Sequence, residues 1–307
     1  MFVGIDVSKK TLDIHILPEN ERLQVPRDAA GLNGLTQHLR SLSPELVVLE
    51  ATGGFEIVVA AALAGAGLPV VVANPAQIGA FARALGRLAK TDRLDAEVIA
   101  LFAERVRPEV RPLADAQTAQ LAELVGRRRQ LVEMLGMEGN RRRQARHPKV
   151  LRGIEKTIAA LQAALTDLDQ EIDDTMRGSP AWRAVEDLLT SVPGVGPITA
   201  RTLIAELPEL GQLSRRRVAA LVGVAPINRD SGTHRGIRGI AGGRGSVRRV
   251  LYMATLVAVR YNPAIRAIYE RLRNGGRPAK VALIAASRKL LTILNAILRE
   301  KTPWQSA

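Results

Sequence analysis

A carboxylate stands inside what looks like the first buried strand of the chain. Asp6 lies between Ile5 and Val7 in the stretch FVGIDVSKK. Burying an unpaired charge is costly unless the group is neutralised or finds a partner. An edge strand could turn Asp6 to solvent, or Asp6 could begin a turn with Ser8. The third explanation is that Asp6 holds a cation at the centre of a sheet.

Three further carboxylates fit the third explanation. Glu50 ends the apolar stretch ELVVLE, and Asp92 and Asp95 are three residues apart at the start of a helical pattern, which places them on one helix face. In open α/β sheets, sites form at the carboxyl ends of strands. Converging carboxylates need a counter-charge. A set of ligands made only of oxygen atoms favours Mg²⁺ or Mn²⁺, and such metal sites catalyse phosphoryl transfer. Asp92 as a helix cap and Glu50 as a loop acceptor remain the structural alternatives.

The first 110 residues alternate strands and helices around these carboxylates. FVGIDVS, TLDIHIL and RLQVP are predicted strands, followed by the helical stretch AAGLNGLTQHLRSL. Strands ELVVLEAT and PVVVANP then alternate with helices, ending in TDRLDAEVIALFAERV. This order predicts a mixed α/β sheet covered by helices, the element order of the ribonuclease H-like (RuvC-like) fold, over residues 1–112.

Residues 113–178 have a different periodicity. Pro148 separates two helical stretches, so an antiparallel helical hairpin is predicted. The second stretch carries a heptad seam made of Ile154, Ile158, Leu161, Leu165, Leu168 and Ile172. Two helices bury such a seam poorly, so we expect a coiled-coil arm that pairs with another copy and makes the chain a dimer, or a tetramer on DNA. An internal strut is the alternative.

Positive charge is concentrated in the last part of the chain. The chain has 44 Lys and Arg against 30 Asp and Glu, a net charge of +14. Residues 181–307 alone hold 21 basic and 7 acidic residues. A charge field confined to one region indicates a polyanion-binding surface, for which nucleic acid is the usual partner. A generally basic surface is the alternative.

Composition excludes several classes of protein. The chain has no cysteine, which rules out disulfides and thiolate metal sites, and only four histidines. No apolar run of about 18 residues and no signal-peptide pattern is found, so we expect no membrane segment and a cytoplasmic location. Aromatic residues make up 3% of the chain, so base stacking on aromatic rings is not the expected mode of nucleic-acid binding.

The region 179–307 is predicted to be mostly helical, with two glycine-rich connections. Gly194 and Gly196 lie in PGVGP between two helices, a helix-hairpin-helix-like pattern whose amides could approach a phosphate; a plain turn is the alternative. The stretch GIRGIAGGRG suits a nucleic-acid backbone. The candidate nucleic-acid-binding arginines around it are Arg229, Arg235, Arg238, Arg244, Arg248 and Arg249.

These motifs together resemble a known family. GIDVSK, LEATGG and KTDRLDA in the first part, and VPGVGPITARTLIAE, LVGVAPINRDSG and VRRVLYMA in the second, are similar to the DEDD insertion-sequence transposases. That family includes pilin-gene invertases and bridge-RNA-guided recombinases. The resemblance covers nearly the whole chain, in two motif blocks in the right order. The short C-terminal tail departs from it, so contacts made by the tail do not transfer.

The resemblance implies a mechanism residue by residue. The acidic tetrad falls on Asp6, Glu50, Asp92 and Asp95, and the nucleophilic serine falls on Ser231. It implies a serine joined covalently to DNA, a Mg²⁺-dependent nuclease domain completing the site, and a noncoding guide RNA that selects donor and target DNA.

The residues around Ser231 allow that role without establishing it. Ser231 is followed by Gly232 in an arginine-rich stretch, with His234 as the nearest candidate base. An ordinary turn serine is the alternative. Ser246 is the competing serine, and we expect it to cap a helix.

Three other functions remain open on sequence grounds. A junction-resolving nuclease would hydrolyse DNA with the tetrad alone and would need neither the serine nor a second basic domain. GIDVSK also resembles the first phosphate loop of actin-like sugar kinases, although no second loop of that type follows. An RNA-binding scaffold with a decayed nuclease domain would not be expected to keep all four carboxylates.

Overall fold

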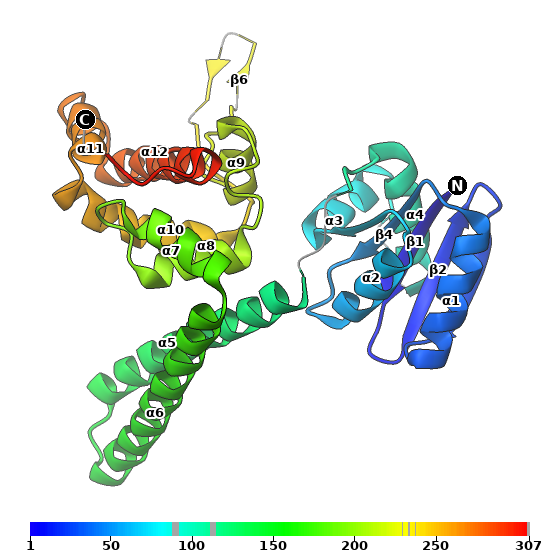
Figure 1. The fold of residues 1–307 in the computed structure, drawn as a ribbon, viewed down its shortest axis with the longest axis horizontal. Helices are drawn as coiled ribbons and strands as arrows, with labels where there is room; N and C mark the ends of the chain where they lie inside the picture. Colours follow the sequence, from blue (N-terminus) through cyan, green and yellow to red (C-terminus); the bar gives the residue numbers. More distant parts are fainter. Residues whose placement is uncertain (88–91, 111–114, 229, 233, 237, 306–307) are drawn as a thin grey trace. The chain divides into compact units, whose positions relative to one another are not determined.

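The chain forms two compact units, Met1–Leu113 and Ala114–Ala307 (Figure 1). The computed structural model describes residues 1–87, 92–110, 115–228, 230–232, 234–236 and 238–305. Residues 92–94, 116, 234 and 235 are described by their backbone alone. The first unit holds the predicted sheet, and the second holds the helical hairpin and the C-terminal helices.

The first unit is built on a five-stranded mixed sheet in the order β3-β2-β1-β4-β5. β1 pairs antiparallel with β2 and parallel with β4, an arrangement that fits the expected ribonuclease H-like domain. Its strands are β1 (Phe2–Val7), β2 (Thr11–Leu17), β3 (Glu21–Pro26), β4 (Leu46–Glu50) and β5 (Val70–Ala73).

The position of β1 decides between the explanations for Asp6. β1 is the central strand of the sheet, so the edge-strand explanation is wrong. The turn after β1 is made by Ser8, whose hydroxyl accepts from the Thr11 amide at 2.9 Å and donates to the Thr11 carbonyl at 2.9 Å. Asp6 is a residue of the strand itself and is half-buried.

Helices cover both faces of this sheet, and alternate strand residues point to opposite faces. Val3, Ile5 and Val7 of β1 pack in one core with residues of α1 (Ala29–Leu42) and α2 (Phe55–Gly65). The other core combines Phe2, Leu46 and Val48 with residues of the remaining two helices, which are α3 (Pro75–Ala84) and α4 (Asp92–Val106). Asp6 and Glu50 fall on the α4 face by the same alternation.

The second unit begins with two long helices that pack against each other, α5 (Ala116–Gln144) and α6 (Pro148–Gly178). The seam residues of α6 are half-buried along most of its length, and Ile172 and Met176 are buried at its base against Leu121 and Val125. The predicted helical hairpin is therefore present. Its use in self-association remains a prediction.

Ion pairs fix the base of this hairpin to the C-terminal helices. Arg129 contacts Glu206 at 2.6 Å, and Arg201 contacts Glu186 at 2.7 Å and also pairs with Asp173 of α6. Burial alone would lower the pKa of Arg201, but its hydrogen bonds to the two carboxylates raise it. The guanidinium therefore stays charged, and the pairing persists across the physiological pH range.

The remaining helices surround one apolar core, to which α12 contributes Ala286, Leu290, Leu291 and Leu294. By length and composition α12 alone among the described helices could cross a membrane, but half of that apolar window is buried inside the unit. It is the central core helix here. The helices are α7 (Pro180–Thr190), α8 (Pro197–Glu206), α9 (Arg215–Val222), α10 (Gly245–Tyr261), α11 (Pro263–Asn274) and α12 (Ala279–Glu300).

Gly4 sets the distance between β1 and α4. A Cβ atom at Gly4 would lie 2.2 Å from the Ala100 nitrogen and 2.4 Å from the Ala96 oxygen, well inside contact distance. The backbone of α4 therefore rests directly on β1, which only glycine permits at this point.

We predict that Gly4→Ala lowers the free energy of unfolding of the first unit by about 1–3 kcal/mol or more.

Gly34 supplies the matched control, because it is exposed on α1 with nothing within 4 Å of its would-be Cβ. Gly34→Ala should stabilise by roughly 0.5–1 kcal/mol. Urea unfolding followed by circular dichroism reports both units, whereas fluorescence reports the second unit alone, since both tryptophans, Trp182 and Trp304, lie there. A Gly4→Ala chain with an unchanged dichroism transition would contradict the close packing.

Candidate functional site

The sheet places Asp6 and Glu50 side by side. β1 and β4 run parallel with Ile5 opposite Leu49, so the next residue of each strand is Asp6 and Glu50. Neighbouring strands lie about 4.8 Å apart, and both side chains fall on the α4 face. Both are half-buried at the carboxyl edge of the sheet. The structure brings these two predicted residues together.

The N-terminal turn of α4 lies at the same edge. Ala96 rests on Gly4, and Phe102 packs further back, in the core that contains Phe2, so α4 runs antiparallel to β1 and its first turn lies towards Asp6. Asp95 is half-buried in that turn. Asp92 is the first residue of α4, but its side chain lies outside the described part of the chain.

The described side chains do not form a ready-made metal cluster. Among them, no group of three or more acidic or histidine residues is close enough to hold a metal ion. The donor types at this edge nevertheless suit Mg²⁺ or Mn²⁺, since Asp6, Glu50 and Asp95 offer only carboxylate oxygens.

A fifth carboxylate, which the sequence analysis did not select, lies opposite Asp6. Asp13 of β2 is the Cα partner of Asp6 and is 4% exposed. Its Oδ1 accepts a hydrogen bond from Gln24 at 2.9 Å, and its Oδ2 is buried with no partner in the described part of the chain. The signal was present in TLDIHIL, where Asp13 interrupts an apolar strand just as Asp6 does.

Glu56 accepts hydrogen bonds from the loop that follows Glu50. It is 8% exposed on the first turn of α2, and one carboxylate oxygen accepts from the Thr52 amide at 3.0 Å and the Gly54 amide at 2.8 Å. These contacts satisfy amides at the helix start and hold the strand end that carries Glu50. The sequence analysis missed this residue as well.

His15 is buried beneath the same face of β2. Its ring is 1% exposed. Burial is the main cause that lowers its pKa below the ordinary value of 6.5, nearby Arg22 and Arg87 act in the same direction, and Glu97 opposes them. The imidazole is therefore held neutral near pH 7.

A pH titration by NMR tests this state. The unfolded chain binds a proton at His15 near pH 6.5 while the folded chain resists it, so folding loses stability as the pH falls below that value. The His15 signal is assigned as the one that disappears from the spectrum of a His15→Gln chain. We predict that in the wild-type chain this signal keeps the chemical shift of a neutral imidazole below pH 6.5. A midpoint at or above 6.5 would contradict burial as the dominant influence.

Ser231 lies in a small exposed hairpin of the second unit. β6 (Asp230–Ser231) pairs antiparallel with β7 (His234–Arg235), and Ser231 is the Cα partner of His234. Gly232 has φ of +56°, the left-handed geometry that tight hairpin turns require. The Ile227 amide donates to the Gly239 carbonyl at 2.8 Å and closes the base of the hairpin. The hairpin presents the Ser231 side chain to solvent.

The six predicted nucleic-acid-binding arginines divide into two sets. Arg238 is exposed near the hairpin, and its guanidinium lies 3.9 Å from Asp230. Arg235 is placed by its backbone in β7, and Arg229 lies outside the described residues. These three belong to the segment that carries Ser231.

The other three arginines make internal contacts. Arg244 holds both oxygens of Glu209 at 2.5 and 2.6 Å and donates to the Glu206 carbonyl at 2.9 Å. Arg248 donates to the carbonyls of Val222 at 3.2 Å and Gly242 at 2.5 Å. Arg249 pairs with Glu133 of α5. The contacts of Arg244 and Arg248 hold the fold of the second unit together, whereas the Arg249 pair is exposed and contributes little. Nucleic-acid binding by all three stays a prediction.

The two glycines of PGVGP have different surroundings. Gly194 has φ of +101°, and a Cβ there would lie 2.6 Å from atoms of Ala258, so Gly194 allows α10 to approach closely. Gly196 is exposed at the N-cap of α8. Ser246 is not the helix cap that we expected: Arg244 occupies the N-cap of α10, and Ser246 donates to Glu206 from inside the helix.

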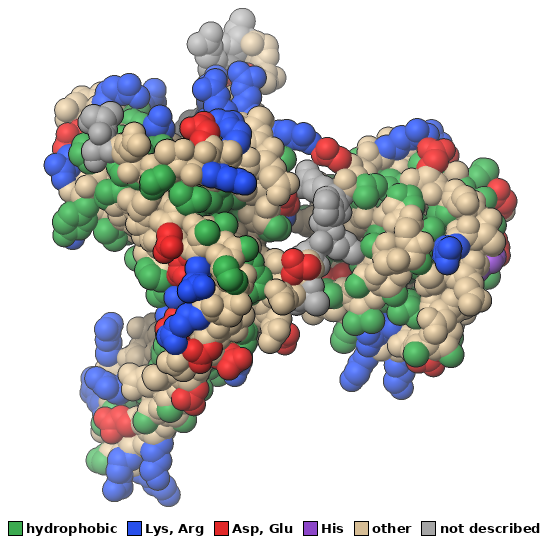
Figure 2. Space-filling model, viewed as in Figure 1, with side chains coloured by type: hydrophobic (Ala, Val, Ile, Leu, Met, Phe, Trp, Pro, Cys, Tyr) green, Lys and Arg blue, Asp and Glu red, His purple; other side chains and the backbone are tan. Residues whose placement is uncertain are grey.

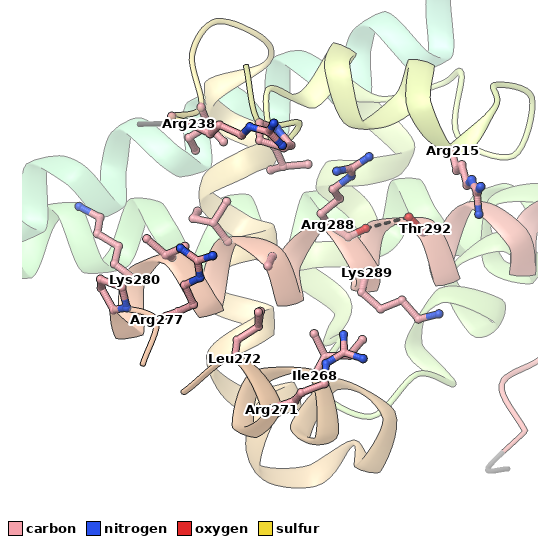
Figure 3. Close-up of a pocket in the computed structure, with 18 of the residues that line it drawn as sticks. Arg215, Arg238, Ile268, Arg271, Leu272, Arg277, Lys280, Arg288, Lys289 and Thr292 are labelled. Carbon is pink, nitrogen blue, oxygen red and sulfur yellow. Dashed lines mark hydrogen bonds between the residues drawn. The ribbon is translucent and has the colours of Figure 1, made fainter. Parts of the chain in front are cut away.

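A basic groove in the second unit is lined by cationic residues of which the sequence analysis selected only Arg238. It encloses about 1430 Å³ between α9, α11, α12 and the segment after the hairpin (Figure 3). Eight cationic side chains line it, and the described lining has no acidic residue. In Figure 2, Lys and Arg gather around this end of the unit and at the tip of the α5–α6 hairpin. The cations are Arg215, Arg216, Arg238, Arg271, Arg277, Lys280, Arg288 and Lys289.

Both units contain residues that match known protein families. Residues 3–154 match a family model described as a transposase, and residues 186–270 match one described as the transposase IS116/IS110/IS902 family. The pilin gene-inverting protein of Moraxella lacunata is 27% identical over 317 aligned positions, covering 99% of this chain and 97% of that protein. An uncharacterized 42 kDa protein of insertion element IS900 from Mycobacterium paratuberculosis is 32% identical over 163 positions, covering 52% of this chain and 39% of that protein.

Proposed function

We propose that this chain, which belongs to the IS116/IS110/IS902 family of transposases, cuts and rejoins DNA through a covalent bond to Ser231. The observation that carries the proposal is the position of Ser231. It is exposed in a short hairpin that is closed at its base, and the Arg238 guanidinium lies 3.9 Å from Asp230, the residue before it. A scissile phosphate could reach it there, and that cation would offset the phosphate charge.

The covalent step conserves the energy of the phosphodiester bond. The Ser231 Oγ loses its proton and forms a bond to phosphorus, while the bond from phosphorus to the leaving sugar oxygen breaks and that oxygen gains a proton. The reverse step, with a different sugar oxygen as nucleophile, releases the serine and joins new strands. No external energy source is needed.

We assign the carboxylate edge of the first unit to metal binding in the same reaction. Asp6, Glu50, Asp92 and Asp95 would hold Mg²⁺ or Mn²⁺, which would offset the charge of a scissile phosphate. Asp13 and Glu56 would keep the strand ends in position. The parallel pairing of β1 with β4 supports this assignment, because it puts two of the four residues next to each other.

The remaining parts of the proposal concern partners and assembly. Donor and target DNA are the substrates, and DNA inversion is one outcome that the Moraxella relative's name suggests. A noncoding guide RNA would select them, consistent with the charge of residues 181–307. Residues 113–178 would act as a coiled-coil arm that pairs two copies, residues 179–307 as the serine-bearing domain with a helix-hairpin-helix-like entry, and the reaction would take place in the cytoplasm.

The covalent mechanism makes a sharp prediction about two variants. Wild-type protein mixed with labelled substrate DNA, Mg²⁺ and the guide RNA that co-purifies with it should yield a protein–DNA adduct that survives denaturing electrophoresis. Ser231→Ala should bind the DNA and yield no adduct, because it lacks the nucleophile. Asp6→Asn should lower the rate of adduct formation by about a hundredfold or more while binding persists.

Ser191 gives a control for the serine substitution. Its hydroxyl donates to the Leu188 carbonyl at 2.7 Å and accepts from the Trp304 amide at 2.9 Å. These contacts are structural, so Ser191→Ala should still form the adduct. Cleavage by wild-type protein with free DNA ends and no adduct would reject the covalent mechanism in favour of a hydrolytic nuclease.

A further inference from the structure

The basic groove has two kinds of surface, which together restrict its ligand. Its rim is cationic, as described above, while its floor is apolar. Val281 lies in the lining and is 53% exposed, although α12 is otherwise a core helix. An apolar side chain so exposed between cations gains nothing from a small inorganic anion. The apolar members of the lining are Val224, Pro226, Ile240, Ile268, Leu272, Pro278, Val281, Ile284 and Ala285.

The cations are spaced along the groove rather than gathered at one point. Figure 3 shows Lys280, Arg288 and Lys289 on α12, with Arg271 reaching the groove from α11 and Arg238 from the opposite side. Lys280 and Thr292 are 12 positions apart on α12, which is a rise of roughly 18 Å at 1.5 Å per residue. A stacked strand rises about 3.4 Å per nucleotide, so the groove matches a run of about five nucleotides.

The apolar floor distinguishes single strands from duplexes. A duplex buries its base faces in its own stack and offers phosphates and base edges to a protein. A single strand offers apolar base faces as well as phosphates. The base faces would pack on the apolar floor, and the phosphates would bind the cationic rim. No aromatic residue lines the described groove, so aliphatic side chains and guanidinium planes would cover the bases.

The groove is continuous with the segment that carries Ser231. Gly236, Arg238 and Gly239 line it, and the Arg238 guanidinium lies 3.9 Å from Asp230, the neighbour of Ser231. A strand lying in the groove would therefore end beside the hairpin. This continuity favours the strand that the serine cuts, which is DNA, over an RNA.

We propose that this groove binds about five unpaired nucleotides of the DNA strand next to the scissile phosphate, with phosphates on the cationic rim and bases on the apolar floor. The inference rests on the proposed function for the identity of the strand. The unpaired strand would be held there while partners are exchanged, so it could not simply re-pair with its former complement.

Binding to labelled 12-nucleotide DNA, RNA of the same sequence and a 12-base-pair duplex tests the inference, by fluorescence anisotropy on the full-length chain at fixed salt. Val281→Ser should weaken single-stranded DNA binding about fivefold or more and change duplex binding less than about twofold. Val58→Ser is the matched control, since Val58 is 60% exposed on α2 of the first unit, outside the groove; it should change neither.

A charge variant and a photo-crosslink locate the binding. Arg288→Gln should weaken single-stranded DNA binding and flatten its salt dependence, while Arg183→Gln, at an exposed position on α7 outside the groove, should do neither. DNA carrying 4-thiothymidine should crosslink to peptides from α11 and α12. Crosslinks confined to other elements, equal effects of Val281→Ser on duplex and single strand, or tighter binding of the RNA would each overturn the proposal.

The same preparations separate this inference from the covalent mechanism. Adduct formation by wild-type protein, with unchanged DNA binding in Val281→Ser, would reject the groove alone. Loss of single-strand binding in Val281→Ser, with no adduct from wild-type protein on any substrate, would reject the covalent role of Ser231 and leave the groove as a DNA-binding site.

Discussion

The contact between Gly4 and α4 is the constraint on which the first unit depends. A helix backbone can lie directly on a strand only where the strand has no side chain, and Gly4 supplies that point on the central strand. The contact fixes the height of α4 above the sheet and its position along β1. Asp95 then lies in the turn that approaches the ends of β1 and β4, where Asp6 and Glu50 are neighbours. Gly4 therefore helps to place Asp95 near Asp6, which follows Gly4 by two residues in β1.

Arginine has two separate uses in the second unit. Arg201, Arg244 and Arg248 are tied to carboxylates or carbonyls and hold helices together, and a charged group used in this way is costly to remove. The arginines of the groove line an exposed surface with no acidic residue in its described lining. Net charge alone does not separate the two uses, because every arginine adds one positive charge to the total of +14 whichever use it serves.

Much of the fold could be predicted from local pattern. Alternation and apolar runs located the five strands, and the GIDV stretch located Asp6, because these signals depend on residues close together in sequence. Features that depend on tertiary contact were missed. Asp13 could be seen in the sequence as a carboxylate inside an apolar strand, but its place opposite Asp6 follows only from the β1–β2 register. The groove combines residues from Arg215 to Thr292 that no periodicity connects. Ser246 was assigned wrongly, since a serine near a helix start is not its cap unless it occupies the N-cap position.

If the sheet edge assembles carboxylates for a divalent metal, as we propose, the full-length chain should bind that metal on its own. The free Mn²⁺ signal in electron paramagnetic resonance reports binding without requiring activity or DNA. Wild-type protein should bind Mn²⁺ in competition with Mg²⁺. Asp6→Asn and Asp95→Asn should each weaken Mn²⁺ binding about tenfold or more. Asp167→Asn, on the exposed surface of α6, should leave Mn²⁺ binding unchanged. An Asp6→Asn chain that binds Mn²⁺ as tightly as wild type would contradict the proposed metal site.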